Sequence, residues 1–207
     1  MAQVTTGIRR VLSHPKVYNA LQFILGSKDF SRWLVEKYII NTDSNNRILD
    51  IGCGTANILD FMTEYSVEYV GFDPSNEYIE LAKKKHGNRG TFKCAYVSED
   101  VVQENDRFDT VLALGVLHHL DDDDVKALIK VVKKALKPGG RFVALDGCYV
   151  EGQNKFAKYL IDNDRGQNVR TEAGYRELFS DDFDKISTEI KHRSWIPYTH
   201  CILVVQN

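Results

Sequence analysis

The sequence predicts an α/β protein with one largely parallel, doubly wound sheet, and three observations lead to that prediction. Short apolar runs alternate with amphipathic helical stretches from about residue 47 to residue 146. Such alternation is typical of parallel strands whose crossover helices cover both faces of a sheet. The chain has 207 residues, the length of one domain. Finally, the last two strand-like runs lie too close together for a helical crossover.

Each element of the parallel part is expected from its own apolar pattern. The predicted strands cover residues 47–51, 67–72, 91–95, 108–114 and 141–146. The predicted helices cover residues 56–65, 75–86 and 121–136. The sequence Lys137-Pro-Gly-Gly140 is expected to end the last helix, because Pro and Gly are favoured just beyond a helix end.

Two further strands are expected at residues 183–190 and 198–205. Only seven residues separate them. A parallel pair would need a crossover of a dozen or more residues, so these strands are predicted to pair antiparallel. Connection length alone thus predicts an α/β sheet that ends in an antiparallel strand.

The segment before residue 45 has apolar residues at helical spacing. Residues 1–45 are therefore expected to form an N-terminal helical lid, although amphipathic helices packed on the sheet would show the same pattern. The main domain is expected to span residues 46–207. Residues 147–180 break the strand–helix alternation and are interpreted as an insertion on the substrate side.

Composition and charge narrow the functional class. The chain is 43% hydrophobic with a formal net charge of −2, which excludes a largely disordered protein. It has no basic footprint for nucleic acid and no basic block for anionic lipid. Cysteines 53, 94, 148 and 201 are far apart and form no CxxC motif, which fits a reducing compartment. Without an apolar run of membrane-spanning length, a cytoplasmic protein with no membrane or nucleic-acid partner is expected.

A glycine-rich turn and an acid after the second strand indicate a ligand site. Gly52 and Gly54 lie where the first strand turns into the first helix, the place where ligands bind in doubly wound sheets. Asp73 ends the second strand, at the position that accepts hydrogen bonds from ribose hydroxyls. A tight turn without ligand and a helix-capping Asp73 are the structural alternatives. Together the two features point to an adenosine-containing cofactor.

Details of the turn select among such cofactors. The dinucleotide fingerprint needs Gly or Ala at position 57, which is Asn57, and no P-loop GK[ST] follows. Asp50, two residues before the first glycine, would repel a pyrophosphate and attract an ammonium group. Adenosine with a cationic amino-acid end and no phosphate is S-adenosylmethionine.

The chain resembles class I S-adenosylmethionine-dependent methyltransferases of the small-molecule type. The resemblance runs from about residue 47 to residue 146, through the motifs LDIGCGTA, VGFDPS, FDTVLALGVLHHL and LKPGGRFV. It departs at Ala56, where the family often has a third glycine, and at Cys94-Ala-Tyr-Val97, where many relatives have an acid that binds adenine. The resemblance implies a Rossmann-like sheet of seven strands in the order 3-2-1-4-5-7-6, with strand 7 antiparallel.

The resemblance also implies which residues bind the cofactor. Asp50 and the turn would hold the methionine end, Asp73 the ribose, and the backbone from Leu114 the sulfonium. Tyr96 takes the adenine in place of the missing acid. The full implied set is Asp50, Gly52, Cys53, Gly54, Asp73, Pro74, Tyr96, Leu114, Gly115 and His119.

The candidate catalytic residues are His118 and Asp146, which follow the fourth strand and end the fifth. A hydroxyl acceptor benefits from a base, and a histidine with an ordinary titration range accepts a proton at pH 7. His118 is expected to face the acceptor and His119 the cofactor, although both could merely brace the loop. The acidic run at 121–124 complements a helix dipole without an ion, so no metal is expected.

Candidate substrate-binding residues come from three segments. They are Tyr18 and Gln22 in the lid, Arg165 and Arg170 in the insertion, and Tyr198 and His200, with Trp195, at the last strand. The two arginines suit a carboxylate or phosphate, but are equally typical of a solvated surface.

The sequence therefore predicts transfer of the methyl group of S-adenosylmethionine to a small molecule, with a hydroxyl oxygen as the favoured acceptor. A non-catalytic S-adenosylmethionine-binding or assembly subunit is the alternative. A nicotinamide-dependent oxidoreductase is disfavoured by Asn57. A nucleic-acid base methyltransferase is disfavoured by the net charge and by the missing Asn/Asp-Pro-Pro-aromatic motif.

Overall fold

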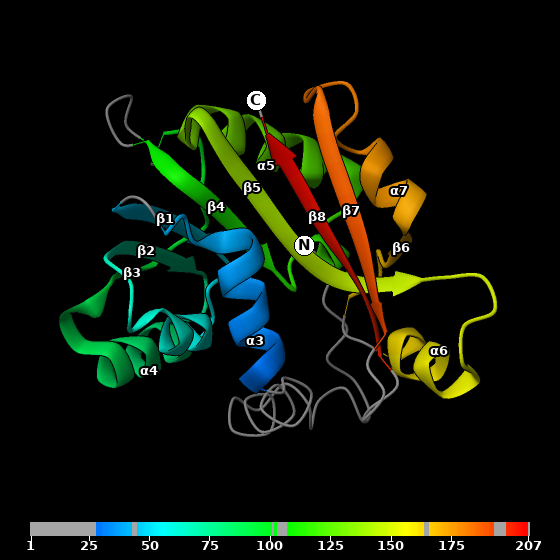
Figure 1. Cartoon of the computed structure of the whole chain (residues 1–207), viewed down its shortest axis with the longest axis horizontal. Helices are drawn as coiled ribbons and strands as arrows, with labels where there is room; N and C mark the ends of the chain where they lie inside the picture. Colours follow the sequence, from blue (N-terminus) through cyan, green and yellow to red (C-terminus); the bar gives the residue numbers. More distant parts are fainter. Residues whose placement is uncertain are drawn as a thin grey trace.

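The computed structural model describes residues 28–42, 45–100, 102, 107–163, 166–192 and 198–206. Within them one sheet has the strand order β3-β2-β1-β4-β5-β8-β7, and a short strand β6 pairs with β5 outside this row (Figure 1). The strands are β1 (Asn46–Ile51), β2 (Val67–Asp73), β3 (Thr91–Cys94), β4 (Phe108–Leu114), β5 (Leu136–Tyr149), β6 (Arg170–Thr171), β7 (Lys185–His192) and β8 (Thr199–Gln206).

The predicted topology is confirmed. Strands β1 to β5 pair in parallel, whereas β8 is antiparallel to both of its neighbours, β5 and β7. If the two-residue β6 is set aside, β7 and β8 are the sixth and seventh strands of the expected order. The short connection between them leaves room only for an antiparallel pair, as the sequence indicated.

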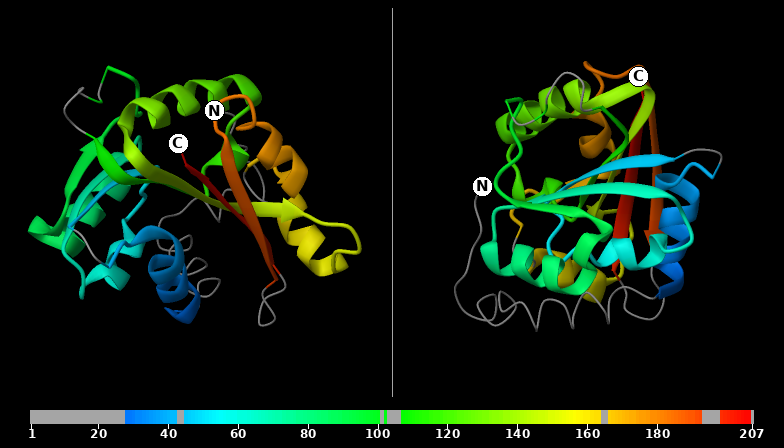
Figure 2. Two further views of the ribbon diagram at one scale, coloured as in Figure 1. Left: turned by 45° about the horizontal axis from the view of Figure 1, so that its top comes forward. Right: turned by 90° about the vertical axis from the view of Figure 1, so that its left-hand side faces the viewer.

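Helices cover both faces of this sheet. They are α3 (Lys28–Leu34), α4 (Asn76–His86), α5 (Asp122–Ala135), α6 (Lys155–Asp162) and α7 (Glu172–Glu177), and α3 continues into a π-helix η1 (Val35–Ile39). One core cluster joins the sheet to α5 and α7, and the other joins it to α3, η1 and α4. Figure 2 shows α5 and α3 on opposite sides of the sheet. The expected doubly wound arrangement is therefore present.

The helix ends before residues 137–140, as expected, but β5 begins at Leu136 rather than at residue 141. Helix α5 ends at Ala135, and the Pro-Gly-Gly sequence lies inside β5, where the pairing with β4 shifts its register. Gly140 permits this close approach, because a Cβ atom there would lie 3.1 Å from the carbonyl oxygens of Phe108 and Asp109. Residues 137–140 thus form an irregular segment of β5 between Leu136 and Arg141, which both pair with β4.

The helix expected at 56–65 is a shorter 3₁₀ helix, η2 (Asn57–Met62). It follows Ala56, which has the left-handed conformation with φ 53° and ψ 38°. The buried residues Leu59 and Met62 are three positions apart, which matches the three-residue turn of a 3₁₀ helix.

Of the expected lid, residues 28–42 are described, and they pack on the sheet. Leu34, Val35 and Ile39 are buried in the core cluster on that face. Tyr18 and Gln22 lie outside the described residues. Within the described part of the chain, every helix is too short or too polar to cross a membrane.

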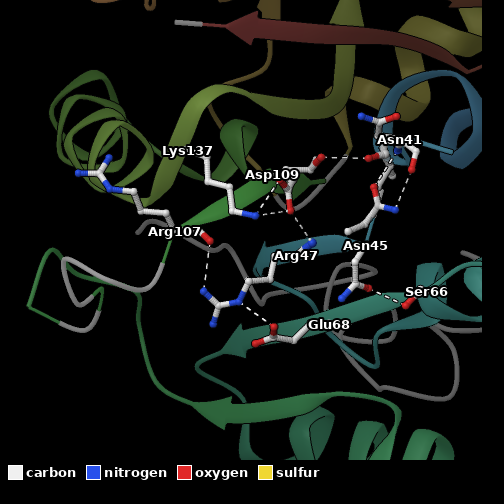
Figure 3. A network of polar contacts seen from close by, with 11 residues as sticks. Asn41, Asn45, Arg47, Ser66, Glu68, Arg107, Asp109 and Lys137 are labelled. Carbon is white, nitrogen blue, oxygen red and sulfur yellow. Dashed lines mark hydrogen bonds and ion pairs between the residues drawn. The ribbon is translucent and has the colours of Figure 1, made fainter. Parts of the chain in front are cut away.

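Ion pairs and buried amides join the strands at the amino ends of the parallel strands, opposite to the predicted ligand site (Figure 3). The carboxylate of Asp109 accepts hydrogen bonds from the backbone N–H of Arg47 at 2.8 Å and from Nζ of Lys137 at 2.8 and 2.9 Å. Asn46 is buried, and its amide bonds to the backbone N–H and carbonyl of Asn41 at 2.7 and 2.9 Å. The contacts of Asp109 join β4 to β1 and β5, and those of Asn46 attach the segment before β1 to the sheet.

We expect Asn46→Ala to lower the free energy of unfolding by about 1–3 kcal/mol, because it leaves two backbone groups of Asn41 without their partner. The matched control is Asn45→Ala, at an exposed residue whose Oδ1 accepts from Ser66 Oγ at 2.6 Å. This control should stay within about 0.5 kcal/mol of the unsubstituted chain. Urea unfolding followed by circular dichroism measures both changes, and equal losses would contradict the assigned role of Asn46.

Candidate active site

The glycine-rich turn folds back onto the end of β2. The backbone N–H groups of Gly52 and Cys53 donate to the carbonyl of Phe72 at 2.8 and 2.9 Å. Gly52 has a φ of 74°, and a Cβ atom there would lie 2.7 Å from Cγ2 of Val116. Both the backbone conformation and the close approach therefore require glycine at position 52.

Asp73, at the end of β2, is hydrogen-bonded to this turn. Its carboxylate accepts from the backbone N–H of Gly54 at 3.0 Å and of Ser75 at 2.8 Å. Burial raises the pKa of Asp73, and these two hydrogen bonds act in the opposite direction. Ser75, not Asp73, is the N-cap of α4, because its side chain accepts from Tyr78 N. The helix-capping alternative for Asp73 therefore does not hold, and the second lone pair of each oxygen remains suited to hydroxyl donors.

Asp50 is a buried carboxylate at the end of β1. The phenol of Tyr69 donates to its Oδ2, whereas Oδ1 is buried without a hydrogen-bond partner among the described residues. Burial raises the pKa of Asp50 to about 6, the bond from Tyr69 lowers it, and the charge of Asp73 raises it. An unpaired buried carboxylate oxygen is costly unless a ligand donates to it, and an ammonium group is such a donor.

His118 and Asp146 form one unit rather than two separate groups. Oδ1 of Asp146 lies 2.5 Å from Nδ1 of His118 and accepts from the backbone N–H of His118 at 3.1 Å. Both side chains are buried, with 10% and 2% of their surfaces exposed. When Nδ1 donates its proton to Asp146, the imidazole lone pair lies on Nε2. The pair thus provides an oriented proton acceptor.

The backbone of the insertion and a second histidine fix this imidazole. Gly166 packs directly on the ring, since a Cβ atom there would lie 1.9 Å from Cδ2 of His118. The backbone N–H of Asn168 donates to the carbonyl of His118 at 2.9 Å. The His119 ring centroid lies 4.0 Å from that of His118, with the ring planes tilted by 42°.

The remaining expected cofactor residues lie along the same edge of the sheet. Leu114 ends β4, and Gly115 follows with a φ of 75° and donates to the carbonyl of Leu145 at 2.7 Å. The carbonyl of Pro74 accepts from the thiol of Cys94 at 3.6 Å. Tyr96, the residue expected at the adenine, is 62% exposed.

Arg170 has protein partners rather than an open guanidinium. It donates to the carbonyls of Leu117, Asn168 and Leu120 at 2.9–3.2 Å and to the carboxylate of Asp122 at 2.7 Å. In this arrangement it holds the loop that carries His118 and His119. Arg165, the other arginine of the expected anion site, lies outside the described residues, as does Trp195.

Tyr198 and His200 flank the end of β5 on the side opposite to Asp146. Gly147 pairs with His200, one position beyond Asp146, so the side chains of Asp146 and His200 point to opposite faces of the sheet. A Cβ atom on Gly147 would lie 2.6 Å from the hydroxyl of Tyr198. The His200 ring also contacts Phe30 of α3, with ring centroids 5.8 Å apart.

The acidic run after His119 begins α5. The side chain of Asp121 caps this helix by accepting from Asp124 N at 2.9 Å, and Asp122 binds Arg170. The described ranges contain no group of three or more His, Cys, Asp or Glu side chains placed to hold a metal ion.

Sequence reasoning missed three residues of the site: Tyr69 beneath Asp50, Gly166 against His118, and Tyr175. The Tyr175 hydroxyl donates to the carbonyl of Gly147 at 2.9 Å. Tyr69 lies two positions before the partner of Asp50 in the pairing of β1 with β2, so strand parity would have placed both on one face. No sequence signal points to Gly166 or Tyr175.

Comparisons with known proteins agree with this geometry. Residues 49–142 match the methyltransferase domain family. A ubiquinone biosynthesis O-methyltransferase of Bradyrhizobium sp. (strain ORS 278) is 36% identical over 108 residues, which are 50% of this chain and 41% of that protein. A tRNA U34 carboxymethyltransferase of Nautilia profundicola is 31% identical over 146 residues, which are 69% of this chain and 47% of that protein.

The chain thus spans half or less of the length of these two curated relatives. Because one of them is named as a tRNA enzyme, the comparisons do not support the expectation that nucleic acid is excluded. Phosphoethanolamine N-methyltransferase 2 of Haemonchus contortus, solved with S-adenosylhomocysteine, superposes with a TM-score of 0.75 at 15% identity over 96% of this chain and 58% of that one. Residues 49–142 therefore match a methyltransferase domain, and the chain has the fold of S-adenosylmethionine-dependent methyltransferases, as its motifs indicated.

Proposed function

We propose that this chain binds S-adenosylmethionine and transfers its methyl group to the hydroxyl oxygen of a small-molecule acceptor, leaving S-adenosylhomocysteine. The observation that carries the proposal is the arrangement at the carboxyl edge of the sheet. There the glycine-rich turn, with two buried carboxylates, lies beside the oriented His118–Asp146 pair.

The residues around the turn fit the cofactor. Oδ1 of Asp50 would accept from the ammonium group of the methionine end, and the carboxylate of Asp73 would accept from the ribose hydroxyls. The backbone of Gly115 would lie along the sulfonium, with His119 beside it. Tyr96 would cover the adenine with a ring that is otherwise exposed. When bound, the cofactor supplies a methyl carbon that its sulfonium has already activated.

The protein contributes alignment and a proton acceptor. The turn and the strand ends hold donor and acceptor in line, which removes most of the entropic part of the barrier. As the acceptor oxygen bonds to the methyl carbon and the carbon–sulfur bond breaks, the hydroxyl proton passes to Nε2 of His118. Asp146 keeps the imidazole in the right tautomer and stabilises the imidazolium that forms.

The acceptor is proposed to lie over the end of β5, between His118 and the pair Tyr198 and His200. Support comes from their place on the two sides of Gly147. Arg170 is proposed to hold the His118 loop rather than an acceptor anion, because its guanidinium bonds to that loop. Tyr18, Gln22 and Arg165 remain predicted acceptor contacts.

One experiment distinguishes this function from its alternatives. The purified protein is incubated with methyl-labelled S-adenosylmethionine and a cell extract, and the label is followed into the small-molecule, RNA and protein fractions. Label in small molecules supports the proposal. Label in RNA would contradict the acceptor class, and tight binding without any transfer would favour the non-catalytic alternative.

For the cofactor, we expect Asp73→Ala to lose the hydrogen bonds from the ribose. Hydrogen bonds to a charged group contribute about 1.5–3 kcal/mol, or roughly tenfold to a hundredfold in affinity. Isothermal titration calorimetry with S-adenosylhomocysteine measures this loss. Tight binding of NAD, with no binding of S-adenosylmethionine, would end this assignment.

For the base, we expect His118→Ala to lower turnover by about 10²–10⁴-fold while cofactor affinity changes only a few-fold. His119→Ala should have the opposite effect and weaken cofactor binding more than it lowers turnover. Initial rates and calorimetry on both variants make the comparison. If the His118 variant turns over normally, alignment suffices and the histidine is a brace; if it loses cofactor affinity instead, the two roles are exchanged.

For the position of the base, we expect Gly166→Ala to displace the His118 ring. Overpacking of this kind costs about 1–3 kcal/mol of stability, and turnover should fall with it. Gly174→Ala is the matched control, because its Cβ atom would meet nothing nearer than Cβ of Arg170 at 3.3 Å. Thermal unfolding and initial rates are measured on both variants. Normal turnover in Gly166→Ala would show that the ring position does not matter.

A further inference from the structure

Tyr69 is a buried phenol that the proposed reaction does not use. It lies in the middle of β2, with 2% of its surface exposed, and donates its hydroxyl hydrogen to Oδ2 of Asp50. Asp50 itself is 2% exposed. A phenol and a carboxylate are thus buried together directly below the glycine-rich turn.

Two glycines that approach one edge of the Tyr69 ring closely help to fix its position. A Cβ atom on Gly71 would lie 3.1 Å from Cε1 of the ring, and one on Gly90 would lie 3.0 Å from Cδ1. The ring of Phe92 packs against it, with centroids 5.9 Å apart. The hydroxyl is therefore held at one place by packing, independently of its hydrogen bond.

The hydrogen bond from Tyr69 gives the two carboxylate oxygens of Asp50 different environments. Oδ2 is occupied by the phenol, whereas Oδ1 has no hydrogen-bond partner among the described residues. Both oxygens belong to one rigid, planar carboxylate. A hydrogen bond that fixes the position of Oδ2 therefore also fixes the direction in which Oδ1 points. A carboxylate without this anchor could rotate or take up a proton instead of meeting a ligand.

We propose that Tyr69 is a positioning residue of the cofactor site, which holds Asp50 ionised and oriented so that Oδ1 receives the ammonium group of the ligand. This inference rests on the proposed function, because it assumes that the ligand has a cationic amino-acid end. It goes beyond that function by assigning a role to a residue outside the glycine-rich motif.

The charges around Asp50 make the proposal testable by pH. The titratable groups that face it are Tyr69 and Asp73 of β2 and Cys53 of the turn. Burial raises the pKa of Asp50 to about 6, and the phenol is the group that lowers it. Above this pKa the carboxylate is charged and attracts an ammonium group; below it the group is neutral and the attraction is lost. Removal of the phenol should therefore raise the pKa of Asp50, so that the attraction for the ammonium group is lost at a higher pH.

The experiment compares two ligands on the full chain. Calorimetry between about pH 5 and pH 7.5, below the usual range for α-amino groups, measures binding of S-adenosylhomocysteine and of 5′-methylthioadenosine, which lacks the amino-acid end. The ratio of the two affinities cancels the contribution of Asp73, because both ligands carry the ribose. The variants are Tyr69→Phe and Asp50→Asn. Tyr38→Phe is the matched control, since its phenol also donates to a carboxylate, that of Glu189.

In the unsubstituted protein and in Tyr38→Phe, the affinity ratio should fall as the pH drops through about 6. In Tyr69→Phe the midpoint should rise by about one to two pH units, so that the ratio at pH 7 is about twofold to tenfold lower. In Asp50→Asn the ratio should be low at every pH. Binding of 5′-methylthioadenosine should be unchanged in Tyr69→Phe, which also verifies that the variant is folded.

An unchanged midpoint in Tyr69→Phe would overturn the inference. An equal loss of affinity for both ligands would also overturn it, since either result would mean that Tyr69 is only a packing residue. If the unsubstituted protein binds 5′-methylthioadenosine as tightly as S-adenosylhomocysteine, Asp50 has no role in ammonium binding and the inference fails. If it binds neither ligand, the proposed function itself fails and the inference falls with it.

Discussion

The proposed site depends on the burial of three carboxylates at the carboxyl ends of the strands, where hydrogen bonds hold each of them. Asp50, Asp73 and Asp146 are all buried. Each is held by neutral or imidazole donors: a phenol, two backbone N–H groups, and the ring and backbone of His118. Among the described residues, no lysine or arginine forms an ion pair with any of them. A buried negative charge of this kind is tolerated only where hydrogen bonds or a ligand stabilise it.

This arrangement selects the charge of the ligand. Uncompensated carboxylates repel phosphates and favour a molecule with a sulfonium and an ammonium group. At the amino ends of the parallel strands, by contrast, the acids are paired with cations. Asp109 binds Lys137, and Glu68 binds Arg47, both at 2.8 Å. The fold therefore separates its polar contacts by function. Ion pairs join the strands at one end, and acids held by neutral or imidazole donors lie at the other end, where the ligand is proposed to bind.

What the sequence predicts depends on how locally each feature is determined. The antiparallel last pair of strands and Gly52 are predictable, because connection length and backbone conformation are local properties, whereas the strand order follows from the family resemblance. The end of the helix before residues 137–140 is predictable from Pro and Gly, whereas the start of β5 at Leu136 is not, because it depends on pairing with a neighbouring strand. Tyr69 and the contacts of Arg170 with the His118 loop are missed for the same reason, since their partners lie 19 and about 50 positions away in the sequence. Only the strand register and the packing of the insertion bring them to the site.

The place of β8 in the sheet has a consequence for how the chain is synthesised. β8 lies between β5 and β7, and in the described residues it is the only strand that pairs with β7. While the ribosome is still adding the residues of β8, β7 therefore lacks its sheet partner and the long β5 has an open edge. Exposed strand edges pair readily with other chains. Until β8 has emerged, the nascent chain thus exposes strand edges that favour aggregation, and insertion of β8 between β5 and β7 then closes this gap in the sheet.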